Sequence, residues 1–221
     1  MLGYVRKLPF WRNYTTAQWS GWWARRKIDW KTSYLDNWNH PHRQMISAIL
    51  KTFPWMSLLE VGCGAGANLA QIVKTHPVGK QLGGIDVNPE AIELAKQTFA
   101  GAFLKVGSVE DIMMSDNSAD VILSDMCLIY VGPRKIGKVL QEMKRVARSR
   151  VVLCELHSDS WVERLKLKYQ SGLHAYDYLK LLEKHGFHDV IRYKLPIEAW
   201  PEGEKQKKFG YVIVAKIPKR K

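Results

Sequence analysis

The sequence has no uninterrupted apolar run of the roughly 18 residues that a helix needs to cross a bilayer. Its three cysteines, Cys63, Cys127 and Cys154, lie far apart and never form a CxxC pair. Such cysteines argue against a disulfide framework and against a cysteine-based metal site. The first residues lack the apolar stretch and the small-residue cleavage site of a secretory signal. We therefore expect a cytoplasmic protein with reduced thiols and no metal.

Acidic residues are scarce at both ends of the chain. Residues 1–31 and residues 204–221 each carry seven Lys or Arg against a single acidic residue, whereas the stretch between them is almost neutral in a chain of net charge +13. Basic ends favour anionic partners, although solvated charge that keeps a protein in solution explains them as well.

The first 38 residues hold six of the nine tryptophans. We predict that residues 1–40 form a helical lid over a cleft, and that residues 41–221 form one domain. Two other interpretations of the lid segment stay open. A basic, aromatic helix lies well on an anionic membrane, and aromatic residues interleaved with basic ones can stack on single-stranded nucleic acid.

Apolar periodicity and turn residues predict an alternation of strands and helices beyond residue 40. Such alternation is typical of a parallel sheet with helices on both faces. The predicted helices are residues 40–53, 67–75, 89–99, 135–147 and 176–185. The predicted strands are residues 57–61, 82–86, 102–106, 120–124, 150–156, 188–193 and 209–215, with a long loop before the last.

The stretch "LLEVGCGAGANL" places Gly62, Gly64 and Gly66 between the first predicted strand and a helix. Glycines at this point let the backbone approach a ligand closely, and Asp86, about 20 residues later, can accept hydrogen bonds from ribose hydroxyls. The spacing is G-x-G-x-G rather than the dinucleotide pattern G-x-G-x-x-G, and it follows the acidic Glu60. A nicotinamide oxidoreductase is therefore disfavoured, and a ligand with an amino group is favoured.

In order along the chain, "LLEVGCGAGANL", "GGIDVNPEAIELA" and "GSVEDIMMSDNSADVILSDMCLIYVGPRKIGKVLQEMKRVAR" resemble class I methyltransferases that use S-adenosylmethionine (SAM). The resemblance is to the small-molecule branch of the ubiquinone/menaquinone-biosynthesis type (methyltransferase type 11), and it covers about residues 57–155. It implies an α/β, Rossmann-like fold with a seven-stranded, mostly parallel sheet whose last strand is antiparallel. It also implies SAM as cofactor and S-adenosylhomocysteine as product.

The resemblance further implies roles for individual residues. Glu60 would contact the amino group of the ligand, Asp86 its ribose, and Asp125 its methionine side. Ser108 stands where the family usually has an aspartate at the adenine edge, and Ile129 and Tyr130 stand where related enzymes often carry two histidines. The cofactor-binding residues that the resemblance implies are Glu60, Gly62, Cys63, Gly64, Gly66, Asp86, Val87, Ser108, Val109 and Asp125.

Methyl transfer needs a base only when the acceptor must lose a proton. The candidates for a catalytic group are Tyr130, His157 and His40, with His42 as a third histidine, before the first strand. An ordinary tyrosine is a poor base at neutral pH because its pKa is about 10.

We therefore predict a SAM-dependent methyltransferase with a small, anionic acceptor. We expect Lys205, Lys207 and Lys208 to face the cleft and to attract that acceptor. A nucleic-acid methyltransferase, a membrane-associated lipid or quinone methyltransferase, and a SAM-binding module without catalysis remain open as alternatives.

Overall fold

The structure is a computed structural model that describes residues 15–200 and 203–218. Its centre is one seven-stranded sheet in the order β3-β2-β1-β4-β5-β7-β6. Strand β7 runs antiparallel to β5 and β6, and the other neighbouring pairs are parallel. The strands are β1 (Ser57–Val61), β2 (Gln81–Asp86), β3 (Phe103–Val106), β4 (Ala119–Asp125), β5 (Ala147–Leu156), β6 (His188–Lys194) and β7 (Gly210–Lys216).

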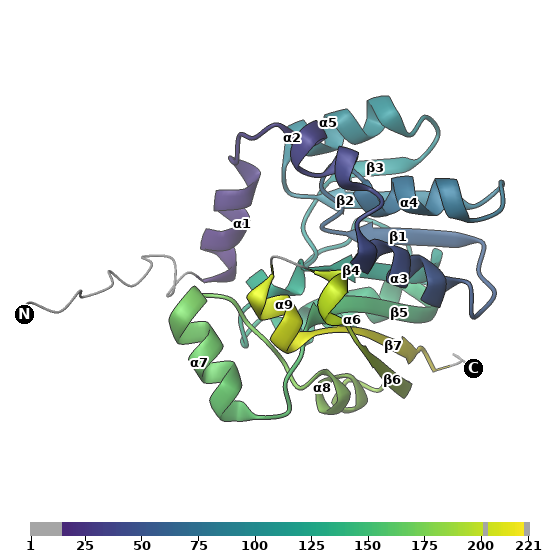
Figure 1. Ribbon diagram of the computed structural model, residues 1–221. Helices are drawn as coiled ribbons and strands as arrows, with labels where there is room; N and C mark the ends of the chain where they lie inside the picture. Colours follow the sequence, from purple (N-terminus) through teal and green to yellow (C-terminus); the bar gives the residue numbers. More distant parts are fainter. Residues whose placement is uncertain (1–14, 201–202, 219–221) are drawn as a thin grey trace, which may run out of the picture.

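Helices cover both faces of the sheet (Figure 1). One face packs against α6 and α8 and the other against α3, α4 and α5, so each face has its own apolar core. All five residues of β1 are buried, as expected for a central parallel strand. The helices described are α1 (Thr16–Ala24), α2 (Trp30–Ser33), α3 (Pro41–Leu50), α4 (Ala67–Thr75), α5 (Pro89–Thr98), α6 (Ile136–Val146), α7 (Trp161–Ser171), α8 (Tyr178–Lys184) and α9 (Glu204–Phe209).

The seven strands and the antiparallel last strand confirm the predicted fold class. Helix α7 was not predicted. Leu167 of this helix is buried, whereas Trp161 and Leu165 are exposed, so its apolar residues do not form the single stripe that marks an amphipathic helix. The loop expected before the last strand contains a 3₁₀ turn at Ile197–Ala199 and helix α9.

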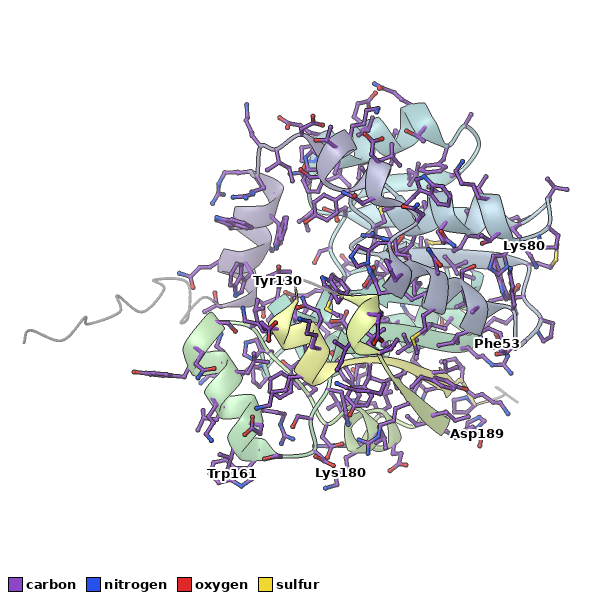
Figure 2. All side chains as sticks on the ribbon, in the orientation of Figure 1. Phe53, Lys80, Tyr130, Trp161, Lys180 and Asp189 are labelled. Carbon is purple, nitrogen blue, oxygen red and sulfur yellow. The ribbon has the colours of Figure 1, made fainter. Side chains whose placement is uncertain are left out.

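Figure 1 shows α1 and α7 gathered at one side of the molecule, and Figure 2 shows Tyr130 close to α1. Tyr130 belongs to a 3₁₀ turn at Leu128–Tyr130 that follows β4. A second 3₁₀ turn, at Leu35–Asn37, connects α2 to α3. Loops at the carboxyl ends of parallel strands converge, so the turn after β4 and α1 enclose the same space as the glycine run.

The first glycine shows how tightly this end of the sheet is packed. Gly62 has a φ of +72°, and its N–H donates to the carbonyl of Ile85 at 2.8 Å. A Cβ at this position would lie 2.5 Å from Cys127 Sγ. Glycine is therefore required both by the backbone conformation and by the approach of the loop after β4.

We expect Gly62→Ala to destabilise the protein more than Gly79→Ala. Gly79 also has a positive φ, +92°, but its Cβ would meet nothing within 4 Å. The control should cost about 1 kcal/mol for the backbone conformation alone. Gly62→Ala should cost about 1–3 kcal/mol more because of the overlap. Urea unfolding measures the free energy of unfolding of each variant. Equal losses in the two variants would show that the contact with Cys127 is unimportant.

Candidate active site

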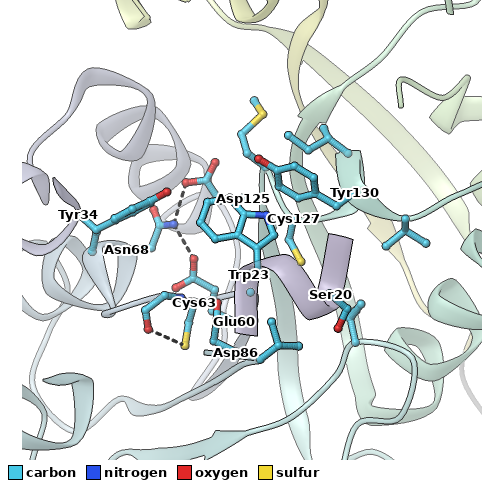
Figure 3. A pocket seen from close by; sticks show the side chains of 18 of the residues that line it. Ser20, Trp23, Tyr34, Glu60, Cys63, Asn68, Asp86, Asp125, Cys127 and Tyr130 are labelled. Carbon is cyan, nitrogen blue, oxygen red and sulfur yellow. Dashed lines mark hydrogen bonds between the residues drawn. The ribbon is translucent and has the colours of Figure 1, made fainter. Parts of the chain in front are cut away.

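A cavity of about 350 Å³ lies at the carboxyl ends of β1, β2 and β4. This volume is within the range of small-molecule pockets. Each of these strands contributes one carboxylate to the wall: Glu60 from β1, Asp86 from β2 and Asp125 from β4. Figure 3 shows the three acids on one side of the cavity, with Trp23, Tyr34 and Tyr130 around them.

Asp86 is held against the glycine loop. Gly64 N–H donates to its Oδ2 at 2.9 Å, and Asn88 N–H donates to its Oδ1 at 2.9 Å. Burial raises the pKa of Asp86, and these backbone hydrogen bonds oppose that shift. Each oxygen keeps a lone pair that can accept a hydrogen bond from a ligand hydroxyl. Val87, the next residue, also lines the cavity.

Asn68 on α4 connects the other two acids. Its Nδ2 donates to Glu60 Oε1 at 2.7 Å and to Asp125 Oδ2 at 3.0 Å (dashed lines in Figure 3). Glu60 Oε2, Asn68 Oδ1 and Asp125 Oδ1 are buried and have no hydrogen-bond partner within the described part of the chain. Leaving buried acceptors unsatisfied costs free energy. Three such oxygens match the three N–H donors of an ammonium group.

The two adjacent carboxyl groups differ in charge. Burial raises the pKa of Glu60 to about 8, although the hydrogen bond from Asn68 opposes this shift. Burial would also raise the pKa of Asp125, but the charge of His42 and its hydrogen bond outweigh burial and hold that pKa well below its usual range. This pair of carboxyl groups therefore carries about one negative charge near neutral pH, as suits one ammonium.

Arg43 of α3 is the one basic side chain that lines the cavity among the residues described. Its Nη1 donates to the carbonyl of Asn37 at 2.8 Å, and its Nε is buried without a hydrogen-bond partner in the described chain. An arginine beside an ammonium-sized niche can bind a carboxylate. Together they suit the zwitterionic end of an amino acid.

Aromatic side chains form another part of the cavity wall. The rings of Trp23 and Tyr130 lie 5.5 Å apart between centroids, and those of Trp30 and Tyr34 lie 5.1 Å apart. Burial raises the pKa of Tyr130 above the ordinary tyrosine value, which is itself well above neutral pH. Tyr130 is therefore protonated near neutral pH and can donate a hydrogen bond, but it cannot serve as a base.

Helix α1 is attached at both ends across this cavity. Gly132 N–H donates to Thr16 Oγ1 at 2.9 Å at its start. Asn88 Nδ2 donates to the carbonyls of Trp23 at 2.8 Å and Arg26 at 2.9 Å at its end. Asn88 is 1% exposed and also caps α5, since its Oδ1 accepts from Ala91 N–H. One side chain therefore connects the ribose-side loop to α1.

Ten of the residues singled out from the sequence line the cavity, and three do not. Gly66 lies behind the loop against Phe99. His157 is 2% exposed, and its Nδ1 accepts from Tyr178 N–H, so it fastens α8 to the sheet. His40 lies outside the cavity and contacts His42. The lining residues are Glu60, Gly62, Cys63, Gly64, Asp86, Val87, Ser108, Val109, Asp125 and Tyr130.

The cations expected at the mouth do not converge on the cavity. The segment that carries them is helix α9, which presents Gln206 to the cavity, and none of Lys205, Lys207 and Lys208 lines it. Lys207 pairs with Glu204 at 2.9 Å and Lys208 with Glu163 at 2.7 Å. Residues 1–14 of the predicted lid lie outside the described residues.

Four residues of the cavity wall were not predicted from the sequence: Asn68, Arg43, Trp23 and Tyr34. Asn68 carried a usable signal, because the first turn of a helix after a glycine loop faces the ligand site. Arg43 lies on the helix before β1, and no motif in the sequence connects it to the glycine run; the tertiary fold brings it to the cavity.

Two properties of the described residues also bear on function. None of the helices is long and apolar enough to span a membrane, and no three His, Cys, Asp or Glu side chains are grouped as metal ligands.

Comparison with known proteins agrees with this geometry. Residues 58–150 match a family model described as a methyltransferase domain. These residues form a methyltransferase domain, and the fold around them is that of class I, SAM-dependent methyltransferases. SAM is the cofactor of this domain, and the three unsatisfied acceptor oxygens and Asp86 fit its ammonium and its ribose.

Among curated relatives, the chain is 32% identical over 121 residues to the ubiquinone/menaquinone biosynthesis C-methyltransferase UbiE of Geotalea daltonii, covering 51% of each chain. It is 32% identical over 124 residues to the O-methyltransferase resE of Aspergillus sclerotiorum, covering 52% of this chain and 45% of the relative. The chain spans about half the length of the curated relatives it matches.

A solved structure extends the similarity to most of the chain. It is the complex between the Haloferax volcanii Trm112 methyltransferase activator and a methyltransferase, with a TM-score of 0.64 and 17% sequence identity. The alignment covers 92% of this chain and 98% of that one. At this identity the likeness concerns the fold.

We expect the binding of S-adenosylhomocysteine near neutral pH to release a proton from Glu60. Glu60 is largely protonated in the free protein because its pKa is about 8, and an adjacent ammonium lowers that pKa. The complex then holds fewer protons than the free protein, so affinity should rise between about pH 6 and 8. Calorimetry in buffers of different ionisation enthalpy counts the protons.

Glu60→Gln is the matched variant for this measurement, because a glutamine Oε1 can still accept the hydrogen bond from Asn68. It should bind without releasing the proton. Equal proton release by the variant and the native protein would mean that another group titrates.

Proposed function

We propose that this protein transfers the methyl group of SAM to a small, uncharged acceptor that lies against its aromatic wall. The observation that carries the proposal is the set of three buried, unsatisfied oxygens on Glu60, Asn68 and Asp125. We expect these oxygens to bind the ammonium of SAM. Arg43 would bind its carboxylate, and Asp86 would bind its ribose hydroxyls. When bound, SAM supplies a methyl group already activated on a sulfonium.

The residues around the cavity would contribute mainly alignment and exclusion of water. The faces of Trp23, Tyr34 and Tyr130 can stabilise a positive charge through their quadrupoles. Ile129, Val131 and Leu173 give the remaining wall an apolar surface. Tyr130 is protonated, and no histidine lines the cavity in the described part of the chain, so we expect an acceptor that reacts without a tyrosine or histidine base.

The charges on the cavity wall support an uncharged acceptor. Among the described residues, an anion in this cavity would meet one cation, Arg43, and the carboxyl groups of Glu60, Asp86, Glu110 and Asp125. Relatives named for O-methylation and for C-methylation both match the chain.

The first test is ligand choice. The native protein should bind S-adenosylhomocysteine and should not bind NAD⁺ in separate titrations. Asp86→Ala should lose most of this affinity, because it removes the ribose contact and the acceptor for Gly64 N–H. Asp159→Ala is the control, since this exposed acid lies on another loop.

The second part of the test is turnover. Native protein should form S-adenosylhomocysteine from SAM with some members of a panel of small uncharged acceptors, and carboxylate analogues of those acceptors should react more slowly. Preference for the carboxylates would overturn the acceptor class. Native-like binding by Asp86→Ala would overturn the site.

We also propose that α1 is a lid that must release one end to admit the ligand. Asn88→Ser keeps a capping oxygen for α5 but loses the two hydrogen bonds to α1. Trypsin should then cleave faster at Arg25, Arg26 and Lys27, and S-adenosylhomocysteine should dissociate several-fold faster. Bound ligand should slow cleavage of the native protein. Equal cleavage with and without ligand would contradict the lid.

A further inference from the structure

Three rings, those of His40, His42 and Trp200, lie together beside Asp125, and Trp200 also lines the cavity. His42 is 1% exposed, and its Nε2 lies 2.9 Å from Asp125 Oδ2. The ring of Trp200 stacks on His42 with 3.9 Å between centroids and 24° between planes. His40 Nδ1 lies 2.6 Å from His42 Nδ1. This group comes from the start of α3 and the turn after β6, far from β4 in the sequence.

The direction of the hydrogen bond to Asp125 follows from chemistry. An ionised carboxylate only accepts, so His42 Nε2 must carry a hydrogen and donate. Burial, followed by the charge of His42, lowers the pKa of His40 to about 4. His40 is therefore neutral near neutral pH, and the hydrogen bond between the two Nδ1 atoms holds the His42 ring in place. Trp200 prevents the ring from tilting.

The donors to Asp125 are unevenly distributed over its two oxygens. His42 Nε2 and Asn68 Nδ2 both bind Oδ2, at 2.9 Å and 3.0 Å. Oδ1 is buried and accepts no hydrogen bond in the described chain. A carboxylate held on one oxygen by two donors from different helices cannot rotate freely. Its second oxygen therefore stays available to a ligand.

We infer that His42 is a positioning residue for the amino end of the bound ligand, acting through Asp125 and held by His40 and Trp200. The inference rests on the proposed function, because it needs SAM or its product in the cavity. His42 does not line the cavity, so it acts on the ligand only through Asp125. It should therefore contribute to binding only when the ligand has an amino group.

A pair of ligands separates this role from a structural one. S-adenosylhomocysteine carries the α-amino group, whereas 5′-methylthioadenosine has the same adenosine and sulfur but no amino acid portion. A histidine that only supports the fold would affect both ligands equally. A histidine that positions Asp125 would affect the first alone.

The matched variants are His42→Gln and His42→Asn. A glutamine amide can reach the position of Nε2 and donate to Asp125, whereas the shorter asparagine reaches only the position of Nδ1. For His42→Asn we expect the Kd of S-adenosylhomocysteine to rise about ten- to hundredfold, as for loss of a charge-assisted hydrogen bond. The Kd of 5′-methylthioadenosine should change less than about twofold. His42→Gln should recover most of the lost affinity.

Calorimetry with the full chain measures these constants, and the double variant His42→Asn with Asp125→Asn should lose little more than Asp125→Asn alone. Equal weakening of both ligands, or unchanged affinity for S-adenosylhomocysteine, would overturn the role of His42 while leaving the proposed function intact. Failure of the native protein to bind S-adenosylhomocysteine would overturn the proposed function itself.

Discussion

The burial of two carboxyl groups side by side is the constraint on which the rest of the site depends. Glu60 and Asp125 end neighbouring parallel strands, and Asn68 binds both. Two ionised acids in an apolar environment would repel each other and would lack solvation. The protein resolves this conflict by burying Glu60 in a largely neutral form and by giving Asp125 a histidine partner. The remaining cost is offset when a cation fills the niche.

The topology of the sheet explains why these groups meet. Strands β1, β2 and β4 are parallel neighbours, so their carboxyl ends lie at one edge, and Gly62 and Gly64 leave room there because they have no side chains. Asp86 then connects the loop to Asn88, and Asn88 connects to α1. A chain of hydrogen bonds thus joins the ribose side of the cavity to the helix that covers it.

The sheet and the acidic half of the site could be predicted because their signals are local. Buried strands such as 57–61 are short stretches of mostly apolar residues, and an acid at a strand end beside a glycine turn is visible in the local sequence. Arg43, His42 and Trp200 could not be found in this way, because each reaches the site through packing between distant elements. The lysines before β7 were misplaced because residues 204–209 form a helix, and its face toward the cavity presents Gln206.

Everything proposed for this site depends on the ammonium niche between Glu60 and Asp125. A crystal structure of the complex with S-adenosylhomocysteine would show whether the niche is used. We expect the amino nitrogen to lie about 2.7–3.2 Å from both Glu60 Oε2 and Asp125 Oδ1, with the ribose hydroxyls on Asp86. An amino group bound elsewhere, with water between Glu60 and Asp125, would contradict it.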